Sequence, residues 1–330
     1  MNPLSHFVRA TLNPAMYHGD GKNPPFFEGW YFKLIDAAEN QRYAIIPGVF
    51  LGEDAHAFIQ VLNGRTAQST YHRFEVADFW AAPDKFEVRI GNNCFSEDVI
   101  SLKINDNLGQ ISGQLKFEGG TAWPVSVTSP GIMGWYAWAP KMECYHGVLS
   151  FDHEIRGGLQ INGETINFSG GRGYIEKDWG QSFPAGYVWF QSNHFATPRT
   201  SLTASIAVIP WLGSAFRGFI VGLWHQGKLY RFATYTGAKT ESLAITDDKV
   251  TWVIRDRRYR LELSARRAEG GLLREPTTSE MLARVEETML ASVEVRLITR
   301  KGETIFEGRG RNAALEVNGD IPGLLAMAAA

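Results

Sequence analysis

Short runs in which apolar and polar residues alternate follow one another along most of the chain. This period of two puts successive side chains on opposite faces, so each run predicts a β-strand. A first series covers residues 28–35, 41–51, 56–62, 70–74, 85–90, 99–105 and 110–118. A second series covers residues 143–154, 159–161, 164–168, 173–179, 186–194, 201–208, 216–225, 228–236, 249–254, 258–264, 291–299 and 303–318.

Helical patterns are few, and strands do not alternate with helices, so a parallel α/β sheet is disfavoured. Residues 279–289 (SEMLARVEETM) fit a short helix by composition or a loop. Asn162-Gly163 predicts a tight hairpin between two strands. Residues 123–141 hold three prolines and two glycines, which indicates an irregular connection between domains. We therefore predict an all-β protein with two antiparallel barrels or nearly closed sandwiches, divided into residues 1–140 and 141–330.

Composition narrows the class of protein. The counts of 20 Phe, 10 Trp and 34 Gly favour strands and turns. A net charge of −2 offers no basic surface, so we expect no nucleic-acid partner. The cysteines, Cys94 and Cys144, have neither disulfide-framework nor zinc-site spacing, and the histidines show no HxH or HExxH motif. We expect no metal.

Hydrophobic runs are short throughout the chain. None approaches the ~20 residues of a membrane-spanning helix, and the N-terminus lacks the apolar stretch of a signal peptide. We expect a soluble, cytoplasmic protein.

The strand 173–179 carries the strongest chemical signal. Its alternation puts Tyr174, Glu176 and Asp178 on one face. Two carboxylates shielded from water cannot both ionise cheaply, so one of them can serve as a proton donor near neutral pH. A solvated strand face would show the same charges, but it has no physical need for the surrounding aromatic residues: Trp179, Phe183, Tyr187, Trp189, Phe190 and Phe195.

Other polar residues lie among apolar neighbours in predicted strands. Glu28 shares a face with Trp30, where it can line a pocket, pair with an arginine or cap a strand edge. Tyr145 and His146 point to opposite faces, and His146 fits either a structural hydrogen bond or a proton relay.

A mixed polar and aromatic stripe follows the carboxylates. It comprises Tyr187, Trp189, Gln191 and Asn193. Packing explains the rings but not the amides, so the stripe suits the polar ring of a bound ligand.

Several segments resemble the tocopherol cyclase family, and more loosely the two-domain lipocalin-like proteins that include carotenoid hydratases. They are 25–33 (PFFEGWYFK), 56–64 (HAFIQVLNG), 142–150 (MECYHGVLS), 173–195 (GYIEKDWGQSFPAGYVWFQSNHF) and 313–319 (AALEVNG). The resemblance is collinear over nearly the whole chain, which departs from the plant enzymes in being shorter and in showing no plastid transit segment.

The resemblance implies two lipocalin-like antiparallel β-barrel domains and an enzyme of the intramolecular lyase or isomerase kind. Such an enzyme protonates an alkene of a prenylated quinol and lets the phenol oxygen capture the cation, without a redox cofactor. Asp178 or Glu176 is then the acid, with His146 as relay, and Glu28, Trp30, Tyr145, Tyr174 and the 187–193 stripe bind substrate.

Two other functions fit the same sequence. A hydratase or another terpenoid-modifying enzyme would use the same acid with a positioned water. A non-catalytic carrier of a hydrophobic ligand would need no shielded acid. A substrate with an isoprenoid tail partitions into lipid, so Trp135, Tyr136 and Trp138 are candidates for peripheral membrane contact or for packing between domains.

Overall fold

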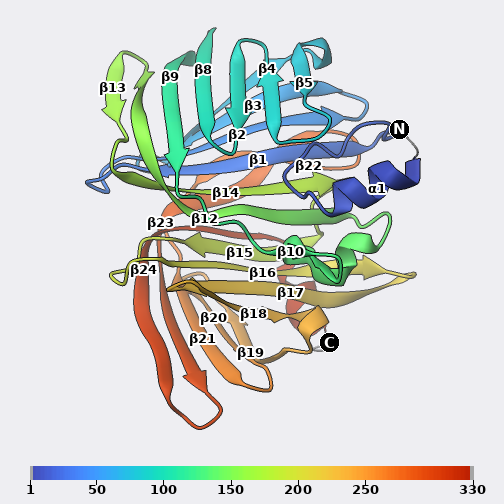
Figure 1. Cartoon of the computed structure of the whole chain (residues 1–330), viewed down its shortest axis with the longest axis vertical. Coiled ribbons are helices and arrows are strands. Elements are labelled where there is room, and N and C mark those ends of the chain that lie inside the picture. The colour runs from blue at the N-terminus through green and yellow to red at the C-terminus, as the bar shows by residue number, and fades with distance from the viewer. Residues whose placement is uncertain (1–2, 328–330) are drawn as a thin grey trace. The chain divides into compact units, whose positions relative to one another are not determined.

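The computed structural model describes residues 3–327 and is built almost entirely of antiparallel strands (Figure 1). Contacts divide the chain into two units. Unit 1 runs to Phe183 and also contains Leu273–Arg284, and unit 2 contains Pro184–Leu272 and the chain from Val285 onward. No described helix is long and apolar enough to cross a membrane.

Unit 1 holds a twelve-stranded sheet, which in Figure 1 runs from blue to green. Along this sheet the strand order is β4-β3-β2-β1-β14-β12-β9-β8-β7-β6-β5, with β13 beside β12. The elements are α1 (Pro3–Thr11), β1 (Phe26–Ile35), β2 (Arg42–Leu51), β3 (His56–Asn63), β4 (Gln68–Phe74), η1 (Val76–Asp78), β5 (Phe79–Ala81), β6 (Glu87–Ile90), β7 (Asn93–Ser96), β8 (Val99–Asp106), β9 (Gly109–Glu118), β10 (Val125–Ser126), β11 (Ser129–Pro130), η2 (Gly131–Trp138), β12 (Cys144–Ile161), β13 (Glu164–Asn167) and β14 (Gly171–Gly180).

Unit 2 is built on a ten-stranded sheet of order β18-β17-β16-β15-β24-β23-β21-β20-β19, with β22 beside β23. The elements are β15 (Gly186–Ser192), β16 (Thr200–Trp211), β17 (Ser214–His225), β18 (Lys228–Ala233), η3 (Thr234–Thr236), β19 (Lys239–Ile245), β20 (Lys249–Arg255), β21 (Tyr259–Arg266), β22 (Gly271–Pro276), β23 (Met281–Thr299), β24 (Thr304–Gly319) and α2 (Ile321–Ala326). The ends of β22 and β23 that meet at their connection belong to unit 1.

The strand pattern of the sequence is confirmed, but closed barrels are not. Among the described residues, no pairing joins the outer strands β4 and β5 of the first sheet, or β18 and β19 of the second. A side-chain contact instead connects two strands of the first sheet that are not paired. His72 Nδ1 on β4 lies 2.7 Å from Asp106 Oδ2 on β8. A twisted sheet can curl around a core in this way without completing its backbone ladder.

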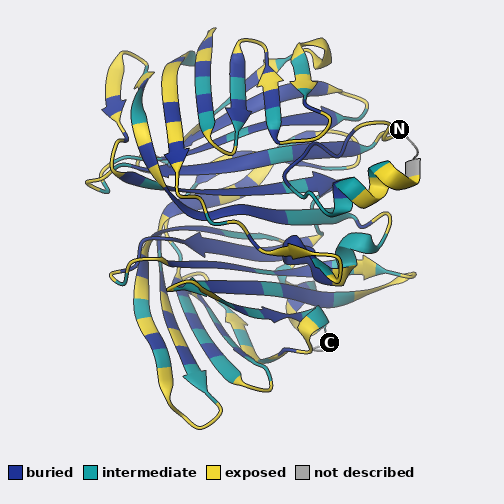
Figure 2. Ribbon diagram, viewed as in Figure 1, coloured by how far each residue is buried: buried dark blue, intermediate teal, exposed yellow. Residues whose placement is uncertain are grey.

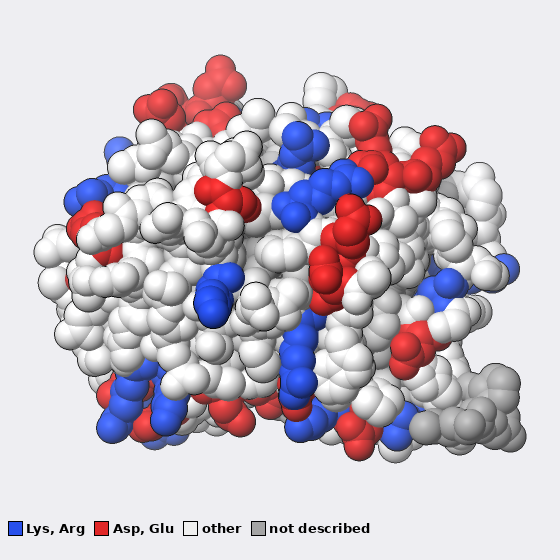
Figure 3. Space-filling model, turned by 90° about the horizontal axis from the view of Figure 1, so that it is seen from above, with Lys and Arg blue, Asp and Glu red and all other residues white. Residues whose placement is uncertain are grey.

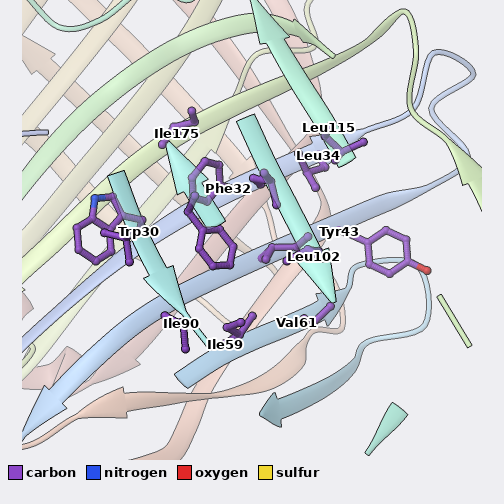
Figure 4. Close-up of a cluster of buried hydrophobic side chains, with 14 of the residues drawn as sticks. Trp30, Phe32, Leu34, Tyr43, Ile59, Val61, Ile90, Leu102, Leu115 and Ile175 are labelled. Carbon is purple, nitrogen blue, oxygen red and sulfur yellow. The ribbon is translucent and has the colours of Figure 1, made fainter. Parts of the chain in front are cut away.

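The hydrophobic core of unit 1 lies on one face of the curled sheet. Figure 4 shows Trp30 and Phe32 of β1 near Ile59 of β3, Ile90 of β6 and Ile175 of β14, all buried members of one cluster. Unit 2 has a separate apolar cluster of its own, which includes Phe190 and Trp252. Figure 2 shows buried positions recurring between exposed ones along β8 and β9, as period-two patterning requires.

Three local expectations have different outcomes. Asn162 and Gly163 form the predicted hairpin between β12 and β13, both with positive φ. Residues 279–289 lie largely in strand β23 rather than in a helix, because pairing of this strand with β22 and β24 outweighs their helical composition. The irregular stretch 123–141 does not end unit 1, since β12 and β14 beyond it pair with β9 and β1. Contacts divide the chain at Phe183 instead of residue 140.

Charged side chains on the surface are mixed in sign. On the face drawn in Figure 3, Lys and Arg lie interspersed with Asp and Glu among larger areas of other residues. This face offers no broad basic surface for a polyanion, which agrees with the balanced charge of the sequence.

Candidate active site

Strand β14 carries different chemistry on its two faces. Tyr174, Glu176 and Asp178 point to one side, as the alternation predicted. Ile175 and Trp179 point to the other side, into the core cluster. We call the side with the carboxylates the acid face.

His146 of β12 completes a group with the two carboxylates. In the antiparallel ladder it stands opposite Asp178, so both side chains project from the acid face. His146 Nδ1 lies 2.8 Å from Asp178 Oδ1, and His146 Nε2 lies 3.6 Å from Glu176 Oε2. The imidazole therefore stands between the two carboxylates. We call these three residues the acid group.

The acid group is shielded to different degrees. The Glu176 side chain is 5% exposed and receives a hydrogen bond from the Tyr174 hydroxyl at 2.5 Å, whereas Asp178 is 26% exposed. Cys144 Sγ lies 3.9 Å from Asp178 Oδ1. Burial and the neighbouring carboxylates raise the pKa of this thiol well above its usual value, so it stays a thiol.

His146 holds a proton at neutral pH. Burial by itself lowers the pKa of a histidine, but the carboxylates of Asp178 and Glu176 outweigh it and raise the pKa of His146 to about 9. The acid group thus contains an imidazolium between two carboxylates, with the ring orientation set by Asp178.

A second charged group lies on the opposite face, within the core side of the sheet. Lys177 Nζ and Glu28 Oε1 are 2.6 Å apart, and both side chains are fully buried. His18 Nδ1 lies 2.8 Å from Lys177 Nζ, and the His18 backbone N–H donates to Glu28 Oε2 at 2.8 Å. We call these three residues the core ion cluster. These contacts connect His18, which precedes β1, and Glu28 of β1 with Lys177 of β14.

Burial and pairing set the charges of this cluster. Burial lowers the pKa of Lys177 to about 8, although Glu28 opposes the shift. Burial also tends to raise the pKa of Glu28, but Lys177 and His18 bring it below its usual value. Lys177 additionally stands over the rings of Trp30 and Trp179, at 5.1 and 4.6 Å from their centroids. Glu28 is therefore an ion-pair partner, with lysine rather than arginine.

The predicted site residues are thus only partly assembled. The structure brings together His146, Tyr174, Glu176 and Asp178. Glu28, Trp30 and Tyr145 lie on the opposite side of the sheet, where Tyr145 stacks on Trp179 at 5.5 Å. Side chains opposite one another in a ladder share a face, so the pairing of Trp30 with Lys177 places it with the core ion cluster.

The stripe Tyr187, Trp189, Gln191 and Asn193 is buried and belongs to unit 2. Tyr187 donates a hydrogen bond to Glu316 Oε2 at 2.8 Å, and Glu316 of β24 stands opposite Trp189. The role of the stripe in ligand binding stays a prediction.

Sequence reasoning missed Lys177, His18 and Glu316. Lys177 lies between Ile175 and Trp179 on an otherwise apolar strand face. A lysine in such a position predicts a buried partner. His18 precedes the first predicted strand, and Glu316 reaches Tyr187 only through strand pairing, so neither has a local signal.

The acid group also has the donor types of a divalent-metal site. One ligand atom from each of His146, Glu176 and Asp178 lies within 4.8 Å of the others. Imidazole and carboxylate donors suit such ions. In this structure the Nδ1 of His146 contacts Asp178 Oδ1 directly, at 2.8 Å.

Comparison with known proteins shows a clear relationship. Residues 103–319 match the tocopherol cyclase-like family. The chloroplastic tocopherol cyclase of Zea mays is 23% identical over 372 aligned positions, which cover 92% of this chain and 77% of the relative. A probable chloroplastic tocopherol cyclase of Oryza sativa subsp. japonica is also 23% identical, over 94% of this chain and 79% of the relative.

Solved structures share the fold. The crystal structure of CghA with Sch210972 has a TM-score of 0.56 at 14% identity and covers 90% of this chain and 89% of its own. Kievitone hydratase from Nectria haematococca has a TM-score of 0.50 at 12% identity, with 92% of this chain and 94% of its own covered. At these identities the likeness concerns architecture alone.

Proposed function

Because the chain belongs to the tocopherol cyclase-like family, we propose that it is an enzyme that closes a chromanol ring on a prenylated quinol. The reaction is an isomerisation in which an alkene is protonated and a phenol oxygen captures the resulting cation. The observation that carries the proposal is the acid group, which holds a proton between two carboxylates on a shielded strand face.

The resting group must become a stronger acid before it can protonate an alkene. An imidazolium whose pKa is about 9 is itself a weak acid. Moving its proton to Glu176 or Asp178 gives a neutral carboxyl beside a neutral imidazole. Excluding water favours this neutral pair over the ion pair. An apolar substrate lying against the acid face therefore promotes formation of the acid that attacks it.

The proton then completes a balanced cycle. The carboxyl gives its proton to one alkene carbon, and a tertiary cation forms at the other. The phenol oxygen bonds to that cation, and its proton returns to the neutral imidazole or the carboxylate. Tyr31 stands opposite Glu176 in the ladder and so presents an aromatic ring on the same face, where such a ring stabilises a nearby cation by about 0.5–2 kcal/mol.

The test uses a prenylated hydroquinone incubated with the purified protein in D₂O. We expect an isomeric chromanol that keeps one carbon-bound deuterium after exchange back into H₂O, because the acid group delivers a solvent-derived proton. A product heavier by one water would identify a hydratase. Binding without any product would identify a carrier, and either result would overturn the cyclase proposal.

Variants connect the reaction to the acid group. Asp178→Asn removes the carboxylate that orients His146, so we expect turnover to fall by at least ~10²-fold while binding of the quinol is kept. Glu164→Gln, an exposed carboxylate on β13, is the matched control and should keep the parent rate. Turnover should also be unchanged by EDTA. If Asp178→Asn retains the parent rate, Asp178 is not part of the acid.

A further inference from the structure

Helix α1 turns apolar side chains toward solvent. Leu4, Phe7 and Val8 have the i, i+3, i+4 spacing of one helix face, and all three are exposed, whereas Ala10 is buried. A helix on the surface of a globular domain usually packs its apolar stripe inward. Figure 2 shows the exposed positions of α1 in yellow. The outward stripe therefore indicates a surface that contacts something other than water.

The segment Val125–Trp138 continues this surface. Val127 is 68% exposed and Trp135 is 48% exposed. The rings of Phe7 and Trp138 meet edge to face with centroids 5.9 Å apart, and the Trp138 indole N–H donates to the Val127 carbonyl at 2.8 Å. Both segments belong to unit 1, so their contact is within one body.

The two segments contain positively charged side chains but no negatively charged ones. Residues 1–19 and 121–142 contain no Asp or Glu, although the whole chain has 35 of them. The same segments contain the cations Arg9 and Lys141. Two segments that supply exposed apolar side chains, an exposed indole ring and no carboxylate match the interface of a bilayer with anionic headgroups.

We infer that α1 and Val125–Trp138 form a docking surface for lipid bilayers that contain anionic lipids. Phe7, Val8, Val127 and Trp135 enter the headgroup region, and the exposed Lys141 faces the anionic headgroups. Arg9 instead donates a hydrogen bond to the Pro83 carbonyl at 2.8 Å. The inference stands on the exposed side chains and the charge distribution alone. It does not depend on the cyclase reaction, and its test measures binding rather than turnover.

The experiment is co-sedimentation of the full chain with vesicles of phosphatidylcholine, with and without phosphatidylglycerol. We expect binding that is stronger with phosphatidylglycerol and weaker in high salt. Phe7→Ser with Val8→Ser, and separately Trp135→Ser, should each weaken binding about tenfold or more, since each removes a large apolar side chain from the inserted area. Thermal unfolding of each variant checks that the fold is kept.

Leu212→Ser is the matched control. Leu212 is an apolar side chain in unit 2 that is 91% exposed at the β16–β17 hairpin, outside the docking surface. It should leave vesicle binding unchanged. Equal binding by the parent chain and the Phe7→Ser, Val8→Ser variant would overturn the inference, as would an equal loss in Leu212→Ser. A dimer in vesicle-free solution that the double variant dissociates would assign the surface to a second copy instead.

Discussion

At the scale of single residues, Glu176 and Lys177 are adjacent in sequence but have different partners. Glu176 lies beside an imidazole and a tyrosine hydroxyl on the acid face. Lys177 lies in the core against Glu28 and His18. A strand makes this separation without a change of backbone conformation, because its side chains alternate. One strand thus carries part of the acid group on one face and part of the core ion cluster on the other.

The proton on His146 predicts how stability depends on pH. The pKa of His146 is raised from its ordinary 6.5 to about 9 in the folded protein. The folded state then binds more protons than the unfolded state between these values. The stabilisation is therefore fully present below pH 6.5 and is lost as pH rises through about 9.

His146→Gln tests this expectation. The difference in free energy of unfolding between the parent chain and the variant should be larger at about pH 6 than at about pH 10. Comparing the two proteins at each pH cancels the titration of Lys177, which both retain. Denaturant unfolding at the two pH values gives the measurement, and an equal difference at both would contradict the assigned pKa.

Glu28→Gln should destabilise the chain strongly. The substitution leaves Lys177 as a buried cation without its carboxylate, and breaking a buried ion pair from one side costs about 3–5 kcal/mol. Adding Lys177→Met should recover part of the loss, because the variant then buries no charge. Glu154→Gln, which removes an exposed partner of Arg156, should cost only about 0–1 kcal/mol. Equal midpoints in urea for the two single variants would refute the role given to Glu28.

Residue-scale prediction from the sequence succeeded where the information was local. The shared face of Tyr174, Glu176 and Asp178 follows from strand alternation alone. The approach of His146 to Asp178 depends on which strands pair and in which register, and no local pattern contains that. The ion pair between Glu28 and Lys177 also has no local signal, because the neighbours of Glu28 in sequence are apolar and Lys177 lies far along the chain.

At the scale of elements, β14 is held between β1 and β12 by close packing as well as by hydrogen bonds. A Cβ added at Gly173 would lie 2.1 Å from His153 Nε2. His153 is buried, and its Nδ1 lies 3.0 Å from Ser150 Oγ. The ring is therefore fixed where a side chain at residue 173 would need room.

Gly173→Ala should lower the free energy of unfolding by about 1–3 kcal/mol, the usual cost of overpacking a core. Gly29→Ala on the adjacent strand β1 is the control, since its new Cβ would find no atom closer than 3.8 Å. Thermal unfolding of both variants gives the comparison. An unchanged midpoint for Gly173→Ala would show that the His153 ring moves freely.

The segment Met281–Met289 shows how composition can give the wrong secondary structure. The residues Met281–Met289 are rich in helix formers, yet they form part of β23. The strand β23 pairs with β22, and from Glu287 onward it also pairs with β24, where Glu287 stands opposite Glu316 and Thr288 opposite Leu315. Both partner strands lie outside the window of eleven residues, and propensity yields to such pairing.

At the scale of the whole molecule, unit 1 depends on a segment distant in sequence. Met281 packs in one apolar cluster with Phe27, Phe50 and Phe58. The Gln60 side chain exchanges two hydrogen bonds with the backbone of Arg274, at 2.9 and 2.8 Å. The connection Leu273–Arg284 thus covers part of unit 1, although it is reached only after most of unit 2 has been traversed.

A chain that ends at Phe183 should therefore be incomplete. Without Met281 and the Arg274 backbone, Phe27, Phe50 and Phe58 lose their cover and Gln60 loses its partners. We expect stronger binding of a dye that reports exposed apolar surface, together with a lower unfolding midpoint than the full chain. Unfolding of this shortened chain at the same midpoint, without dye binding, would show that Leu273–Arg284 is dispensable.

The same dependence has a consequence during protein synthesis. After the ribosome has added Phe183, it must still translate residues 184–272 of unit 2. Only then does it make Leu273–Arg284, the segment that completes unit 1. At about 5–20 residues per second this delay is on the order of 5 to 20 seconds. For that interval the nascent chain presents an uncovered aromatic cluster outside the ribosome tunnel, which is a binding target for chaperones that recognise apolar segments.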